Sequence, residues 1–255
     1  MEPTYRARVI VLRKTKLGEA DLIVTLLAQD GSQLRAVAKG ARKPSSPFSS
    51  RLELGAVADV LLAHGRSLDI VKEARLVAGN ERIRESLERN ACAAPMTELL
   101  DRLTQEGLEN ARLFPLTETA LAALGRAEPA QAPAVCAAQL LKTFAFVGLR
   151  PSFDACVGCS APVATGDAAR TAWVSYADGG VVCPSCRVHT ECVGVPAATV
   201  AWCRTLLMST FAQVERLPPD PGAAFGALRF CQEWSRFHVG HQLKSLNFLF
   251  TCGLF

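Results

Sequence analysis

The stretch ADLIVTLLAQDGSQLRAVAKG, from Ala20 to Gly40, is the clearest structural signal in the N-terminal part of this chain. Two apolar, strand-like runs flank the pair Asp30-Gly31. This arrangement predicts a β-hairpin, because Asp and Gly tolerate the backbone conformations of a tight turn. Three further runs have the alternation or the β-branched residues of strands, namely RARVIVLRKT (6–15), GAVADVLLA (55–63) and LDIVKEARLV (68–77).

The five predicted strands all fall within residues 1–80. Such a set closes most simply into a small barrel, because closure removes the unpaired edges of an open sheet. A long basic segment between the third and fourth strands favours a five-stranded OB-fold barrel. An SH3-like barrel is the alternative on these residues.

From residue 81 onward the apolar residues recur at helical spacing, with charged residues on the other face. We therefore predict an α+β protein with an OB-fold domain over 1–80 and a helical domain over 81–255. The helical domain contains a zinc ribbon at about 153–192. The segments predicted to be helical are 81–107, 111–127, 132–149, 197–216 and 223–249.

The composition is that of a folded protein, since 49% of the 255 residues are apolar. No apolar run approaches the roughly 20 residues of a membrane span, and the N-terminus lacks the pattern of a signal peptide. We expect a soluble, cytoplasmic and nucleoid-associated protein with no membrane partner. In that reducing compartment ten cysteines indicate a metal site or buried thiols rather than a disulfide framework.

The positive charge is concentrated at the N-terminal end. Residues 1–80 hold 13 basic and 8 acidic residues, whereas the rest of the chain holds 15 and 16. Between Gly31 and Arg51 there are five basic residues and no acid. The segment AVAKGARKPSSPFSS (36–50) is rich in Gly, Pro and Ser and is predicted to be a loop that cannot pack, either solvated or binding phosphates. Its one aromatic residue, Phe48, is either a stacking surface or an anchor to the barrel.

Two C-x-x-C motifs, CVGC (156–159) and CPSC (183–186), are separated by 23 residues. Each presents two thiolates to one side of a tetrahedral ion, and the segment TAWVSYADGGVV between them predicts a two-stranded hairpin around Asp178-Gly179-Gly180. We predict one structural Zn²⁺ per chain, because four thiolates leave no open position for catalysis. The predicted ligands are Cys156, Cys159, Cys183 and Cys186.

Several alternatives to this zinc site stay open. The four thiols could be a lapsed site or form disulfides, and Cys192 could replace one ligand. His189 and Glu191 form an H-x-E motif like that of zinc deaminases, but here it follows the C-x-x-C motif instead of preceding it. The remaining cysteines are expected to be small core residues, namely Cys92, Cys136, Cys203, Cys231 and Cys252.

No catalytic motif stands out, since the sequence has neither a phosphate-binding G-x-x-x-x-G-K-[ST] motif nor a G-x-S-x-G motif. His238 and His241 are expected to lie on the polar edge of the last helix rather than to bind metal. We predict that the protein is not an enzyme.

The order of these parts resembles the bacterial recombination mediator family RecO, over nearly the whole chain. The residues that carry the resemblance are GEADLIVTLL (18–27), AVAKGARKP (36–44), LELGAVADVLL (52–62), FVGLRPSFDACVGC (146–159) and HVGHQLKSLNFL (238–249). The resemblance implies binding of single- and double-stranded DNA, annealing of complementary strands and, with RecR, loading of RecA onto DNA coated by single-strand-binding protein. It also implies a contact between the helical domain and the acidic, phenylalanine-ended C-terminal tail of that coating protein.

The resemblance assigns Lys39 and Arg42 to the DNA-binding loop of the family, and Lys244 to the contact with the tail of the coating protein. An ordinary solvated lysine is the alternative for Lys244. We add four residues to the predicted DNA contacts because of their charge and position, namely Lys43, Arg51, Arg35 and Arg13.

Two other functions remain as alternatives to a DNA-annealing mediator. One is a zinc-stabilised scaffold for protein interactions in which DNA contact is incidental. The other is a zinc enzyme that acts on nucleic acid.

Overall fold

The computed structural model describes residues 3–163 and 170–255, which form two compact units, Met1–Gly125 and Arg126–Phe255. The first unit contains five strands and three helices, and the second contains further helices and a small sheet. The first compact unit includes helices up to Gly125 as well as the strands, so its limit does not mark the end of the barrel. The domain boundary predicted near residue 80 therefore stays a prediction. Among the described residues, no helix is both long and apolar enough to cross a membrane.

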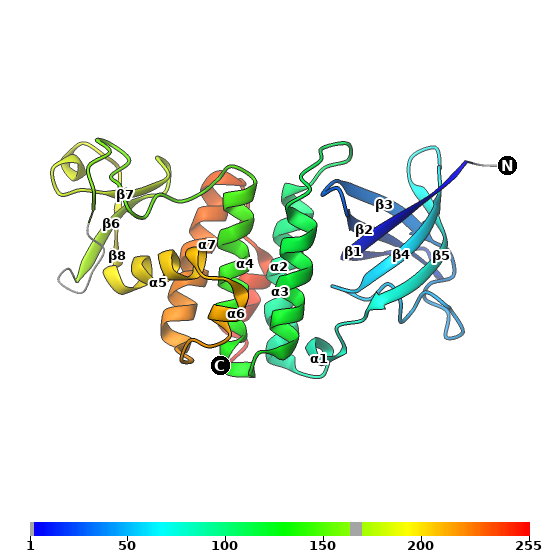
Figure 1. Ribbon diagram of the computed structural model, residues 1–255. Coiled ribbons are helices and arrows are strands. Elements are labelled where there is room, and N and C mark those ends of the chain that lie inside the picture. The colour runs from blue at the N-terminus through cyan, green and yellow to red at the C-terminus, as the bar shows by residue number, and fades with distance from the viewer. Residues whose placement is uncertain (1–2, 164–169) are drawn as a thin grey trace. The chain divides into compact units, whose positions relative to one another are not determined.

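The strands of the first unit form a closed barrel, in the order β1-β2-β3-β5-β4 (Figure 1). All neighbouring pairs are antiparallel except β3 and β5, and β1 closes the barrel by pairing with both β2 and β4. The predicted five-stranded barrel and the α+β class are thus confirmed. The strands are β1 (Thr4–Leu17), β2 (Asp21–Ala28), β3 (Gln33–Ala38), β4 (Val57–Ala63) and β5 (Asp69–Ala78).

The hairpin predicted around Asp30-Gly31 joins β2 to β3, with Leu27 opposite Gln33. The Asp30 carboxylate accepts hydrogen bonds from the backbone amide and the hydroxyl of Ser32, at 2.8 and 2.7 Å. Gly31 has a φ of 85°, and a Cβ atom there would lie 1.9 Å from the carbonyl oxygen of Asn110. The turn therefore requires glycine both for its backbone conformation and for the close approach of the segment around Asn110.

Strand β1 contains a β-bulge at Leu12. The register with β2 steps from Val11 opposite Leu26 to Arg13 opposite Thr25, so Leu12 is the extra residue. Before the bulge the odd-numbered residues Val9 and Val11 face the barrel core. After the bulge the even-numbered residues face that side, because Lys14 pairs with the core residue Val24.

Three helices complete the first unit, namely α1 (Glu81–Arg84), α2 (Leu87–Leu103) and α3 (Leu113–Arg126). The hydroxyl of Ser86 caps α2 by accepting from the backbone amide of Arg89. Helix α2 packs against β1 and β2, and the side-chain amide of Gln33 donates to the carbonyl oxygen of Asp101 at 3.1 Å. One face of the barrel is therefore covered by a helix.

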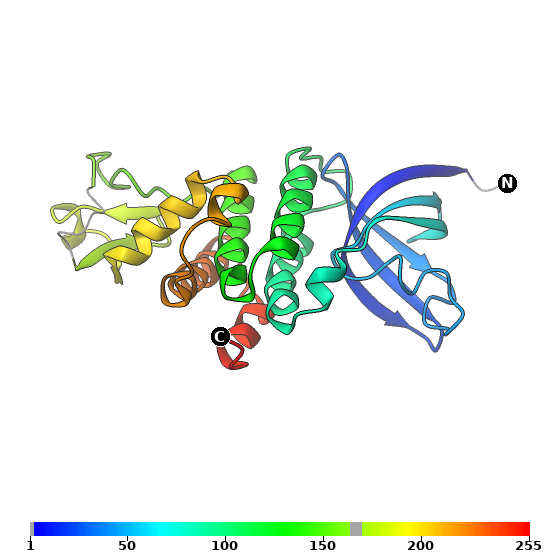
Figure 2. The ribbon, with the colours of Figure 1, turned by 60° about the horizontal axis from the view of Figure 1, so that its bottom comes forward.

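In the second unit the long helices α4 and α7 lie side by side, and α5 packs against both (Figures 1 and 2). Two segments of this unit predicted as single helices are each divided, and so is the predicted helix 81–107 of the first unit, between α1 and α2. The first breaks at Ser209 and Thr210, where Thr210 starts a new helix with a capping box, and the second breaks at 239–243. The elements are η1 (Pro129–Gln131), α4 (Ala132–Phe146), α5 (Ala197–Met208), α6 (Phe211–Val214), α7 (Pro221–His238) and α8 (Lys244–Thr251).

A three-stranded sheet of β6 (Thr171–Ser175), β7 (Gly180–Val182) and β8 (Val193–Pro196) forms the rest of the second unit. The hairpin of β6 and β7 is the predicted one, whereas β8 lies beyond the predicted ribbon and is only four residues long. Aromatic contacts join this part to α7, with Tyr176 and Phe153 both packed on Phe230 at ring-centroid distances of 5.3 and 5.4 Å. The apolar core thus continues from the helices into the ribbon.

Replacing Gly31 by alanine should destabilise the first unit, and Gly18→Ala is the matched control. Gly18 also has a positive φ, of 56°, but an added Cβ there meets no atom within 4 Å. We expect Gly18→Ala to cost about 1 kcal/mol from backbone strain alone, and Gly31→Ala to cost at least roughly 2 kcal/mol more because of the clash. Urea unfolding measures both free energies, and equal values would contradict the close approach to Asn110.

Candidate nucleic-acid interface and metal centre

The β3–β4 loop, residues 39–56, is folded onto the barrel instead of being free in solvent. Ala41 and Leu52 are 3% and 1% exposed, and Phe48 packs against the barrel core. The expectation that this segment cannot pack is therefore wrong, because three apolar residues among the serines and prolines supply the contacts. Of the two roles considered for Phe48, the structure shows that of an anchor.

Hydrogen bonds hold the first turn of the β3–β4 loop against the turn between β1 and β2. The Gly40 amide donates to the Asp21 carboxylate at 2.7 Å, and the Arg42 amide donates to the Ala20 carbonyl at 2.9 Å. The Arg42 guanidinium donates to the Gly18 carbonyl at 2.9 Å and stays exposed. Lys39 and Lys43 are exposed beside it. Three cations are therefore presented on a short, fixed piece of backbone.

A groove of about 510 Å³ lies where this loop meets the end of the barrel. We call it the loop groove. Because of the bulge at Leu12, Lys14 and Lys16 face the loop side, and Lys14 pairs with Glu53 at 2.5 Å. The sequence analysis missed both lysines. The signal that could have found them is the run VIVL (9–12), which interrupts the alternation of the strand. The groove is lined by cationic and acidic residues that comprise Lys14, Lys16, Arg42, Lys43 and Glu53.

The other predicted DNA contacts lie elsewhere on the barrel. Arg13 and Arg35 are both opposite Thr25, so they share one face of the sheet, and Arg13 lies 3.4 Å from the Asp101 carboxylate of α2. The Arg51 guanidinium donates to the carbonyl oxygen of Ala74 at 3.0 Å, on the side of β5. The structure therefore groups Arg42 and Lys43 in the loop groove, and it places Arg13, Arg35 and Arg51 on other surfaces.

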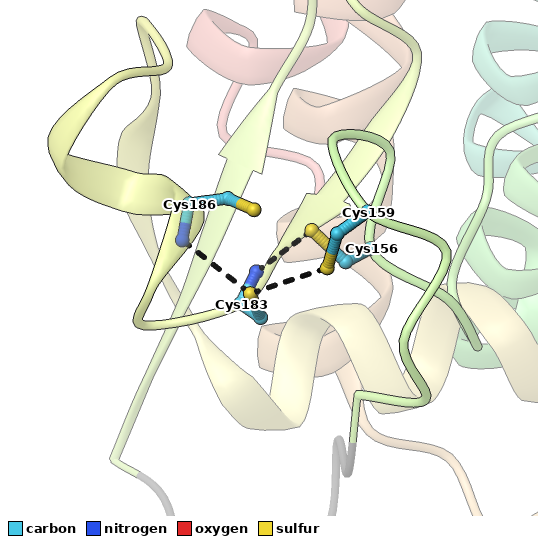
Figure 3. Close-up of side chains that lie close together, drawn as sticks. All are labelled: Cys156, Cys159, Cys183 and Cys186. Carbon is cyan, nitrogen blue, oxygen red and sulfur yellow. Dashed lines mark hydrogen bonds between the residues drawn. The ribbon is translucent and has the colours of Figure 1, made fainter.

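The four predicted cysteines come together as one cluster that could bind a metal such as zinc. Their sulfur atoms all lie within 4.8 Å of one another, and they point toward a common centre (Figure 3). The sulfur atoms of Cys159 and Cys183 are 3.7 Å apart. A tetrahedral zinc ion with bonds of about 2.3 Å requires sulfur–sulfur distances of about 3.8 Å. The thiol geometry therefore fits such an ion.

Two segments position these thiols. The first motif lies in the connection from α4 to β6, where the Val157 amide donates to the Val181 carbonyl of β7 at 3.0 Å. The second motif directly follows β7 and leads into a short 3-10 helix, η2 (Cys186–Val188). Strand β7 therefore fixes both motifs, one through backbone pairing and one through chain continuity.

Backbone amides around the cluster favour the ionised form of one thiol. Donation from the amide of Cys183, with further amides of Gly158 and Cys159, lowers the pKa of Cys156 to about 6. Hydrogen bonding to Cys159 and Cys183 raises the pKa of Cys186 to about 12, because neighbouring sulfur atoms favour its protonated form. A thiolate at Cys156 at neutral pH is ready to ligate a cation.

Within residues 3–163 and 170–255 the metal-binding cluster consists of these four cysteines, and neither His189 nor Cys192 belongs to it. The other cysteines mostly confirm the expected core role. Cys92, Cys136, Cys203 and Cys231 are buried, and burial raises the pKa of the last three, whereas Cys252 is partly exposed. His238 ends α7 with its ring 4.3 Å from that of Trp234, and His241 lies in the following turn.

Both the N-terminal and the C-terminal part of the chain match models of known protein families. The family model described as Recombination protein O N terminal matches residues 1–80, and the one described as Recombination protein O C terminal matches residues 84–247. A DNA repair protein RecO from a Nocardioides species is 36% identical over 250 residues, which cover 96% of this chain and 98% of that protein. DNA repair proteins RecO from Frankia casuarinae and Bifidobacterium adolescentis are 36% and 31% identical, over 97% of this chain and 98% and 99% of their own lengths.

Replacing Phe48 by alanine should loosen the β3–β4 loop. Removal of a half-buried ring should cost about 1–2 kcal/mol of stability, less than the 3–5 of a fully buried one, and should expose the backbone near Lys39 and Arg42 to protease. Limited trypsin digestion should then cleave after Lys39 and Arg42 several-fold faster than in the unchanged protein, whereas Pro44 protects the bond after Lys43. Phe48→Leu, which keeps most of the apolar contact, is the control. Equal cleavage rates in the alanine variant and the unchanged protein would contradict the anchor role.

Proposed function

The chain belongs to the RecO family of DNA repair proteins, and on that basis we propose that it is a recombination mediator that anneals complementary DNA strands. With RecR it helps load RecA onto DNA coated by single-strand-binding protein. The observation that carries the proposal is the anchored β3–β4 loop, whose first turn presents the exposed cations Lys39, Arg42 and Lys43, the last two of them in the loop groove. The family consists of non-enzymatic repair mediators.

Contacts between these cations and phosphates would supply affinity that does not depend on base sequence. Each phosphate that a lysine or arginine neutralises releases condensed counterions, so binding weakens as the salt concentration rises. Lys14 and Lys16 extend the positive surface of the loop groove, whereas Glu53 offsets part of the charge of Lys14. Binding by the backbone suits annealing, because the base edges stay free to pair with a second strand.

The residues around the groove support binding of the backbone rather than stacking of bases. Phe48 packs against the barrel core and is half-buried, so part of its ring is occupied by protein contacts. An aromatic platform would compete with base pairing, whereas lysine and arginine side chains hold a strand by its phosphates. An annealing protein concentrates the strands and screens their charge, and this requires no bond chemistry.

We also propose that Cys156, Cys159, Cys183 and Cys186 hold one structural zinc ion. The fit of the sulfur spacing to a tetrahedral ion and the amide donors around Cys156 support this assignment. Such an ion would cross-link the two C-x-x-C motifs and add on the order of 10 kcal/mol to the folding of the ribbon. All four positions are thiolates, so the ion would be structural.

For the tail of the single-strand-binding protein we propose a contact at α8. Lys244 is exposed at the first position of that helix, and Phe248, four residues later, is 59% exposed. Residues four apart lie on the same side of a helix. This side therefore combines a cation with an apolar ring, which suits an acidic tail that ends in phenylalanine.

Neutralising the loop cations should impair DNA binding and annealing. In the triple variant Lys39→Ala, Arg42→Ala, Lys43→Ala, the slope of log affinity against log salt for single strands should fall by about 2, at roughly 0.7 for each lost contact. The annealing rate at moderate salt should fall at least tenfold. The measurement is a strand-annealing assay with naked and coated strands, titrated with salt.

The control for this experiment is Arg82→Gln with Arg102→Gln, which removes two exposed charges on α1 and α2 of the same unit. It should anneal as the unchanged protein does. Unchanged annealing and salt dependence in the triple variant would contradict the proposed role of the loop. That result would favour a protein-interaction scaffold in which DNA contact is incidental.

Removing one predicted ligand should abolish zinc binding. We expect one zinc ion per chain in the unchanged protein and none after dialysis of Cys183→Ser, because three thiolates and a hydroxyl bind the ion far more weakly. Elemental analysis measures the content, and thermal unfolding should show a less stable second unit. Cys192→Ser, close in sequence but outside the cluster, is the control and should keep its zinc. Full zinc content in Cys183→Ser would refute the ligand set.

A further inference from the structure

A second and larger groove, of about 830 Å³, lies on the outer face of the barrel. We call it the outer groove. Strands β1, β4 and β5 form its floor, and part of the β3–β4 loop, with Pro47, Phe48 and Arg51, forms one wall. Five cationic and two acidic residues line it, so it carries an excess of positive charge. The charged residues are Arg6, Arg8, Arg51, Lys72, Arg75, Asp59 and Glu73.

Because of the strand register, most of these charged residues lie in rows that run across β1, β4 and β5. Arg8 on β1 is opposite Asp59 on β4, which in turn is opposite Arg75 on β5. Directly paired residues share a face of the sheet, so all three side chains point outward together. Asp59 lies between two arginines and is bound by Arg8 at 2.8 and 3.2 Å, which lowers the pKa of the Asp59 carboxyl. The charge of Arg75 is thus only partly offset.

A β-bulge adds a further cation to this face. The register between β4 and β5 steps from Leu61 opposite Glu73 to Leu62 opposite Val71, so Lys72 is the extra residue. As a result Lys72 and Glu73 are both exposed, although they are neighbours in the strand. Arg6, opposite Leu61, completes the next row on the side of β1.

The outer groove and the loop groove are separate surfaces of one barrel. Of the residues that line them, Phe48 is the one they share. On β1, Arg6 and Arg8 lie before the bulge at Leu12 and face outward, whereas Lys14 and Lys16 lie after it and face the loop groove. The anchored loop thus forms a wall between two positively charged channels.

We infer that the outer groove binds a second length of DNA backbone while the loop groove holds the first. This inference rests on the proposed function, because annealing requires one protein to bring two strands together. Rows of exposed arginine and lysine on a rigid sheet suit a repeating polyanion, which offers a phosphate to each cation along its length. Two strands held on either side of the same loop would lie close together with their bases free.

The test uses the full chain and two oligo(dT) strands, which cannot pair with each other, labelled with a donor and an acceptor fluorophore. One equivalent of the first strand is bound per chain, and the second strand is then titrated at low salt while energy transfer is recorded. Sedimentation of the same mixture counts strands per chain. The variant is Arg6→Gln with Arg75→Gln, which leaves the Arg8–Asp59 pair and the Arg51 contact in place. The control is again Arg82→Gln with Arg102→Gln.

We expect the unchanged protein and the control to bind two strands per chain. The Arg6→Gln, Arg75→Gln variant should bind the first strand with an affinity within twofold of the unchanged protein. Its affinity for the second strand should fall at least tenfold, with a salt slope smaller by about 1.4 for two lost contacts. The rate at which it anneals complementary strands should fall in parallel. Circular dichroism of the variant should match that of the unchanged protein, since both arginines are exposed.

Failure of the inference and failure of the proposed function give different results. If the unchanged protein anneals DNA but binds only one strand per chain, the function stands and the inference is overturned. The inference also falls if the variant and the control bind the second strand equally well. It falls likewise if the variant keeps both strands but loses binding of a labelled poly-glutamate peptide, since the groove would then serve an acidic protein partner. If the unchanged protein binds no DNA, the proposed function itself is wrong.

Discussion

Closure of the barrel through β1 is the constraint on which the rest of the first unit depends. This strand pairs with β2 along its second half and with β4 along its first, and its central residues Val9–Leu12 are buried. Strict alternation would place Lys14 and Lys16 on the outer side with Arg6 and Arg8. The bulge at Leu12 reverses the alternation, and one strand therefore contributes cations to two different surfaces.

The β3–β4 loop, which carries the proposed DNA contacts, is held in place by the barrel. Its serines, prolines and glycine indicate an irregular segment, yet Ala41, Phe48 and Leu52 tie it to the core and Asp21 holds its first turn. Anchoring lowers the entropy that a free loop would lose in the proposed binding of a strand. It also keeps the loop in place between the two grooves, so that each retains its own lining.

The ribbon is also a short segment that a few specific contacts hold in place, here aromatic rings and a cluster of thiols. Its sheet is small, and its apolar contacts to α7 pass through Phe153, Tyr176 and Phe230. Four thiols within reach of one ion can supply the stability that so short a sheet lacks. Because β7 fixes both C-x-x-C motifs, the cluster and the sheet support each other.

Turn residues, alternation and C-x-x-C spacing are local signals, and they are enough to predict the five barrel strands, the hairpin at Asp30-Gly31, the cysteine cluster and the basic loop. Divided helices and the short strand β8 were decided by tertiary structure, because their limits depend on packing and on pairing with distant residues. Tertiary structure also decides which side chains line the candidate nucleic-acid interface. Whether Arg13, Lys14 or Lys72 faces a groove depends on strand register and on the bulges at Leu12 and Lys72, because a shift of one residue in register moves a side chain to the opposite face.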